Sequence, residues 1–104
     1  MDTDALRARY LTLTRESLPA RAGSEPGWPV RFDHCFMRIV LDHAVGRRWT
    51  DVVQSPAYKN LTDEQLRRAV AAAERMLDEG PETARVLNRA SLDARGKRGP
   101  AAAR

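Results

Sequence analysis

Apolar residues recur at helical spacing near the N-terminus of the chain. Leu6, Tyr10 and Leu13 follow one another every three or four residues, which places them on one side of a helix. This pattern predicts a first helix over residues 4–17, ending ahead of Pro19, because proline disfavours helical geometry in the residue before it. The Gly- and Pro-rich segment 20–29 is then expected to form a loop.

The segment 32–45 is apolar around most of a helical circumference, which is typical of a buried central helix. The remaining narrow arc carries His34, Arg38 and Asp42 at four-residue intervals. Gly46 follows as a C-terminal stop. We therefore expect this helix to form the centre of the fold, with the three ionisable residues at the edge where core meets solvent.

The second half of the chain predicts further helices and no strand. A short helix is expected over residues 50–53. Thr62 and Gln65 form a capping box at the start of a longer helix, and Gly80 ends it. The next residue, a proline, opens a last helix over residues 81–94. The predicted class is all-α: a small bundle of about four helices around the second one.

Basic residues gather at the C-terminus. A chain of 104 residues fits one domain, and it carries 18 basic against 14 acidic residues. Four of the basic residues follow residue 94, which leaves 14 of each sign before it. We expect a neutral helical domain over residues 1–94 and a disordered basic tail over 95–104. The tail can engage nucleic acid or another polyanion, or only keep the chain soluble; its candidate contacts are Arg95, Lys97, Arg98 and Arg104.

Signals for export or membrane insertion are missing from the sequence. Its N-terminus is acidic and precedes no long apolar run, and Cys35 is its single cysteine. We expect a cytoplasmic protein without a membrane span or a disulfide. A core of this size leaves open whether the chain is a monomer or a homo-oligomer.

The stripe of His34, Arg38 and Asp42 is the strongest candidate site. Arginine offers a rigid donor fork, histidine exchanges protons near neutral pH, and aspartate can orient either. The alternative is a structural role, as a solvated charge ladder or in pairs with neighbouring helices. Trp28 and Trp49 are candidate ligand-binding residues beside Arg38, although a tryptophan next to Pro and Gly also serves as a plug at the edge of a core.

Cys35 and His43 each have a catalytic and a structural interpretation. Cys35 lies near a helix start, where a thiolate is favoured, but it also fits a small buried apolar residue. His43 falls in the middle of the apolar arc, as a hydrogen-bonded core histidine would. No second Cys/His pair completes a metal site, and no glycine-rich phosphate loop occurs. We expect neither metal nor cofactor.

Several segments resemble a family of small microbial proteins. The similarity runs through residues 28–36, then Arg38, Ile39, Asp42, Gly46 and Trp49, and continues through residues 56–59, 61–62, 65–66, 87–92 and 95–97. Such proteins often carry the label of the general-control-related N-acetyltransferase (GNAT) superfamily. The resemblance implies acyl transfer from acyl-CoA, which that superfamily binds at a strand-to-helix turn with an R/Q-x-x-G-x-G/A motif. This chain contains no such motif.

Two classes of function remain open. The first is a helical binding or adaptor protein whose basic tail engages an anionic partner such as nucleic acid. The second is a small enzyme or ligand-binding subunit that uses the face of His34, Arg38 and Asp42, with Cys35 as a further catalytic candidate. An enzyme needs a concave pocket that excludes water, whereas an adaptor needs only an exposed surface.

Overall fold

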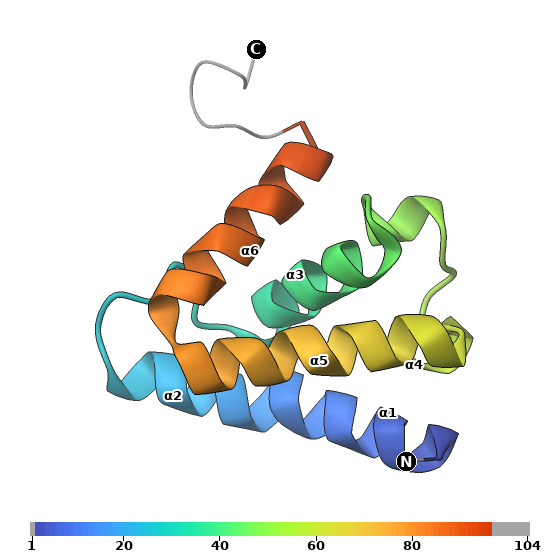
Figure 1. Ribbon diagram of the computed structural model, residues 1–104, viewed down its shortest axis with the longest axis horizontal. Helices are drawn as coiled ribbons and strands as arrows, with labels where there is room; N and C mark the ends of the chain where they lie inside the picture. Colours follow the sequence, from blue (N-terminus) through green and yellow to red (C-terminus); the bar gives the residue numbers. More distant parts are fainter. Residues whose placement is uncertain (1, 97–104) are drawn as a thin grey trace.

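The computed structural model describes residues 2–96 as a set of helices joined by turns (Figure 1). No strand occurs within this range, which confirms the predicted all-α class. None of its helices is both long and apolar enough to cross a lipid bilayer. In chain order the elements are α1 (Thr3–Thr12), the π-helical segment η1 (Leu13–Ser17), α2 (Leu18–Ser24), α3 (Asp33–Val45), the 3₁₀ turn η2 (Trp49–Asp51), α4 (Ala57–Asn60), α5 (Asp63–Glu79) and α6 (Pro81–Ala94).

The first predicted helix boundary is wrong. α1, η1 and α2 form one continuous helix along the lower edge of Figure 1, so residues 20–24 are helical where a loop was expected. In η1 the N–H of Leu18 bonds to the carbonyl of Leu13, five residues back. This wide turn lies directly before Pro19 and displaces the carbonyl that the proline ring would otherwise strike. The helix therefore continues past the proline.

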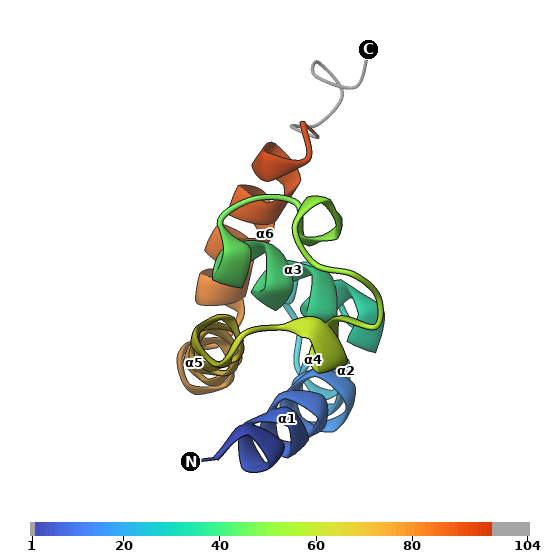
Figure 2. The ribbon, with the colours of Figure 1, turned by 90° about the vertical axis from the view of Figure 1, so that its right-hand side faces the viewer.

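α3 lies at the centre, as predicted. It packs against α5, α6 and the N-terminal helix (Figures 1 and 2). Phe36, Ile39 and Leu41 are fully buried. Gly46 ends the helix in the left-handed conformation, with φ of 78°, and its N–H bonds to the carbonyl of Asp42.

The buried side of α3 differs from the predicted arc. Phe32 precedes the helix and is 64% exposed, and His43, expected in the core, is also exposed. Asp42, expected at the solvent edge, is buried. The physical reason is the position of α6, which covers the stripe of α3 that carries Arg38 and Asp42.

α5 and α6 follow the predicted signals. The side chain of Thr62 accepts from the N–H of Gln65, and the Gln65 side chain accepts from the N–H of Thr62. Gly80 adopts φ of 90° and breaks the chain direction, so that α6 rises away from α5 and lies beside α3 (Figure 1).

The described domain extends two residues beyond the predicted boundary at residue 94. The N–H of Arg95 bonds to the carbonyls of Ser91 and Leu92, and its side chain contacts Asp42. Arg95 therefore belongs to the helical domain and not to a free tail. The rest of the predicted tail, with Lys97, Arg98 and Arg104, lies outside the described residues.

Candidate functional site

Arg38 of α3 reaches across to α6. Its two terminal nitrogens donate to the hydroxyl of Ser91 at 2.7 Å and to the side-chain oxygen of Asn88 at 2.8 Å. Partial burial lowers the pKa of Arg38 from its ordinary value, and the neighbouring Cys35 acts in the opposite direction. The guanidinium nevertheless stays charged near neutral pH, because an arginine in a protein is not deprotonated there.

Asp42 is the most heavily bonded side chain of the site. Its carboxylate is 1% exposed and forms an ion pair with Arg95, whose side chain is 19% exposed. Arg95 donates from Nε to Oδ2 at 2.7 Å and from Nη2 to Oδ1 at 3.1 Å. Ser91 also donates to Oδ2, and the backbone N–H of Trp49 donates to Oδ1. One buried carboxylate thus joins α3, α6 and the segment after Gly46.

Helical spacing aligns the partners of this network. Arg38 and Asp42 lie four residues apart on α3, while Asn88, Ser91 and Arg95 follow at intervals of three and four along α6. Ser91 is buried and links the two charged residues, since its hydroxyl accepts from Arg38 and donates to Asp42. The network runs in the same direction along both helices.

The chemistry of this network is that of a structural clamp. A carboxylate that already accepts four hydrogen bonds holds no free lone pair directed at a substrate, and the Arg38 fork is occupied by two acceptors. Removing one partner of a buried ion pair costs about 3–5 kcal/mol, because the other charge is left buried and uncompensated. The arrangement holds the end of α6 against α3.

The structure does not bring His34 into this network. Its side chain is 76% exposed, lies 3.5 Å from the carboxylate of Asp33, and stacks on the ring of Phe32. Cys35 is partly buried and free of disulfides. No group of three or more His, Cys, Asp or Glu residues within 2–96 is placed to hold a metal ion.

The two tryptophans pack at the edges of the core. Trp28 meets Phe36 edge-on at 5.9 Å, donates from its indole nitrogen to Glu25 at 2.7 Å, and lies under the guanidinium of Arg21. Trp49 is half-buried against the core, and only its backbone reaches Asp42. Both contacts agree with the plug interpretation, in which a tryptophan seals the edge of the core.

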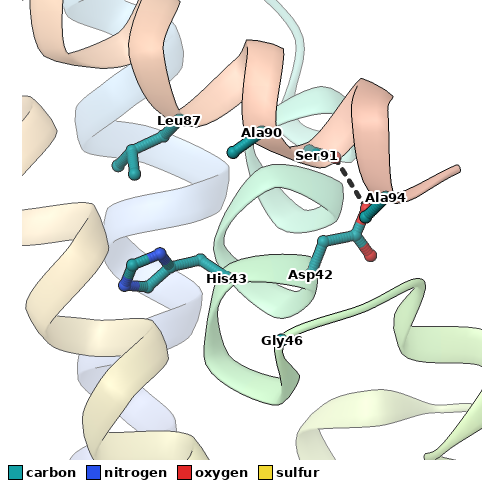
Figure 3. A pocket seen from close by; sticks show the side chains of 7 residues that line it. All are labelled: Asp42, His43, Gly46, Leu87, Ala90, Ser91 and Ala94. Atoms are coloured by element: carbon teal, nitrogen blue, oxygen red, sulfur yellow. Dashed lines mark hydrogen bonds between the residues drawn. The ribbon is translucent and has the colours of Figure 1, made fainter.

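A small pocket of about 160 Å³ lies beside the clamp, between α3 and α6 (Figure 3). Asp42 and Ser91 lie at one end of it, and His43 and Leu87 at the other. Ala90 and Ala94 of α6 and Gly46 complete the lining. The wall of this pocket is mostly apolar, and the exposed imidazole of His43 is its one polar side chain that the clamp does not engage.

Sequence reasoning missed the α6 side of the site. Asn88 and Ser91 lie in a segment of the family resemblance but belong to no known motif. Their further signal was a spacing of three residues, the same spacing that separates Ala84 from Leu87 on the buried side of the helix. Polar residues at core positions of an amphipathic helix indicate buried hydrogen bonds. Their partners across the interface are visible only in the structure.

No protein-family model matches this chain, and no curated protein or solved structure is significantly similar to it. The resemblance to N-acetyltransferases stays a prediction that these comparisons do not test. Residues 2–96 contain no strand, so the strand-to-helix turn that binds acyl-CoA in that superfamily has no counterpart among them.

Proposed function

We propose that this chain is a small helical binding protein that engages a polyanion, nucleic acid in particular, through its basic C-terminal residues. The proposal rests foremost on the ion pair between Asp42 and Arg95. This pair fixes the end of α6, and with it the point from which the sequence continues into Lys97 and Arg98.

The ion pair lies next to two further arginines. Asp42 accepts from both Arg95 and the backbone N–H of Trp49 through the same Oδ1 atom, so the end of α6 adjoins the turn that carries Arg47 and Arg48. Both arginines are exposed, and the ion pair of Arg47 with Asp51 at 3.6 Å is a surface pair open to solvent. We group these two arginines with the basic residues that follow Gly96 in the sequence and call the set the basic end: Arg47, Arg48, Lys97, Arg98 and Arg104.

Arg95 is not included among the proposed contacts to the polyanion. Its charge is compensated by Asp42 at 2.7 Å, and releasing it would expose a buried carboxylate. Affinity for a polyanion is therefore expected from the basic end, by neutralisation of phosphates and release of counterions. Such binding is independent of nucleotide sequence and weakens steeply with salt.

The alternative, an enzyme or ligand-binding subunit, requires His34, Arg38 and Asp42 to converge on one pocket. Arg38 and Asp42 are engaged with α6, while His34 is exposed beside Phe32. The binding protein is therefore the function that the geometry favours.

Fluorescence anisotropy with a labelled duplex and a labelled single strand of equal length tests the proposal. We expect micromolar or weaker binding to both, with log K falling linearly against log salt. Ending the chain after Gly96 removes three positive charges and should flatten the salt slope by about 2.7 on the duplex and about 2.1 on the single strand. Arg47→Gln with Arg48→Gln should weaken binding further.

The matched control is Arg75→Gln on α5, an arginine paired with Glu79 at 3.3 Å. This variant should leave both affinity and salt slope unchanged. Binding that survives removal of the C-terminal residues at full strength would contradict the proposal.

A further inference from the structure

An exposed aromatic pair stands at the start of α3. Phe32 is 64% exposed, although burial of an aromatic side chain is strongly favourable. Its ring lies parallel to the ring of His34, with centroids 5.8 Å apart and an angle of 5° between the planes. His34 is itself exposed. The two exposed rings therefore lie together at the N-terminus of α3.

A cationic groove lies on α6 near this pair. Its volume is about 270 Å³, and its lining includes two exposed arginines and no acidic residue. We call it the α6 groove; it is lined by Pro29, Arg85, Asn88, Arg89 and Leu92.

Two observations place the aromatic pair close to the α6 groove. Pro29, in the groove, precedes Phe32 by three residues, a span of at most about 10 Å. Asn88, also in the groove, is bonded to Arg38, and His34 lies one helical turn before Arg38 on the same stripe of α3. A chain lying in the groove can therefore reach the rings.

We propose that the Phe32–His34 pair and the α6 groove form a binding surface for single-stranded nucleic acid, with an unpaired base on Phe32 and the phosphates along Arg85 and Arg89. Proteins that bind single strands combine a positively charged groove with aromatic side chains on which bases stack. A duplex keeps its bases stacked on each other and cannot offer one to Phe32. The two arginines give the groove charge complementarity to phosphate, which a purely apolar partner would not match.

This inference rests on the proposed function and adds a preference to it. The basic end attracts any polyanion, whereas the aromatic pair favours a strand with unpaired bases over a polyanion of equal charge that has no bases. The two contributions are separable, because they lie on different residues.

The test compares a twelve-nucleotide oligothymidine with an abasic strand of equal length, which has the same phosphates and no bases, both read by fluorescence anisotropy. The full chain should bind oligothymidine about fivefold or more tightly than the abasic strand. Phe32→Ala should remove this preference, and Phe32→Tyr should retain it. Arg89→Gln should weaken both strands to the same extent.

Val86→Ala is the matched control, because Val86 is an equally exposed apolar side chain, at 62%, on α6. It should keep the preference for oligothymidine. Thermal melts of the variants should match the parent protein, since neither Phe32 nor Val86 belongs to the core.

Several outcomes overturn the inference. A third probe, an oligoglutamate of matched charge, has negative charges but neither phosphates nor bases. Equal binding of all three probes would show a site for any acidic polymer. This result would overturn the inference and leave the proposed function unaffected. A preference that persists in Phe32→Ala places base recognition elsewhere. Absence of binding to all three probes overturns this inference and the proposed function together.

Discussion

At the scale of the residue, Asp42 shows how contacts with another helix determine whether a carboxylate is structural or free to bind a ligand. Asp33, Asp42 and Asp51 all lie within or near α3 and η2, but only Asp42 is buried. A single carboxylate that receives Arg95, Ser91 and the N–H of Trp49 stabilises the fold through several charge-assisted hydrogen bonds at once. This side chain therefore stabilises the fold and is not free to bind a ligand.

Asp42→Asn should lower the free energy of unfolding by about 3 kcal/mol, because it leaves the guanidinium of Arg95 without its buried counter-charge. Chemical denaturation measures the effect. Asp51→Asn is the control, since Asp51 pairs with Arg47 at 3.6 Å on the surface, and a loss below about 0.5 kcal/mol is expected there. Equal effects of the two variants would show that the clamp contributes no more than a surface pair.

Tyr10 has the opposite character, a buried polar group without compensation. The side chain is fully buried, and its hydroxyl oxygen has no hydrogen-bond partner among the described residues. Because a buried unsatisfied polar group costs about 1–3 kcal/mol, Tyr10→Phe should raise the free energy of unfolding by about 1 kcal/mol. Tyr58→Phe, at a half-buried tyrosine, should change it little. A loss of stability in Tyr10→Phe would reveal a partner for the hydroxyl.

The same hydroxyl predicts a dependence on alkaline pH. Burial raises the pKa of Tyr10 above its ordinary value of about 10, and the charge of Arg15 opposes the rise only in part. Above pH 10 the unfolded state loses this proton while the folded state keeps it, so the folded state binds more protons and stability falls as pH rises. The slope should steepen through pH 10 and approach about 1.4 kcal/mol per pH unit above pH 11. Urea denaturation between pH 9 and 11 should show a shallower decline in Tyr10→Phe.

At the scale of the element, two prolines behave differently because of what precedes them. Pro81 follows Gly80, whose positive φ has already ended α5, so the proline begins a new helix. Pro19 follows the π-helical turn of η1, which makes room for its ring, so the helix continues. The residue type alone did not distinguish these cases.

The end of α6 gives a prediction at this scale. Ending the chain after Gly96 keeps the bonds of Arg95 to Asp42 and should leave the melting temperature unchanged. Ending it after Ala94 removes Arg95 from Asp42, and a loss of about 3 kcal/mol corresponds to a fall of roughly 10 °C or more in a domain of this size. Differential scanning fluorimetry compares the two chains directly. Identical melting temperatures would mean that Arg95 does not stabilise the fold.

At the scale of the whole molecule, α3 is the element that the others share. It contacts α5, α6 and η1, whereas α6 contacts chiefly α3 and α5. Local opening follows the density of packing, so the slowest native-state hydrogen exchange should occur at the amides of Ile39 to Leu41.

The variant Asp42→Asn refines this exchange experiment. It should speed exchange in the second half of α6 more than in α5, because the clamp joins that half to α3 while α5 packs through its own apolar side chains. A uniform acceleration over the whole domain would indicate that α6 and the core open as one unit.

The sequence by itself determined the helices whose start and stop signals are local. The capping box at Thr62, the stop at Gly46 and the change of direction at Gly80 act within a few residues, so α3, α5 and α6 could be predicted with nearly correct bounds. The apolar character of residues 32–45 also predicted that this helix lies at the centre of the fold.

Only the tertiary structure decided which side of α3 is covered. Helical spacing put His34, Arg38 and Asp42 on one stripe, but it could not show that α6 covers the last two and leaves the first in solvent beside Phe32. The burial of Asp42, the exposure of His43 and the capture of Arg95 all depend on contacts between residues about fifty positions apart. Periodicity within one helix carries no information about such contacts, because packing between helices sets them.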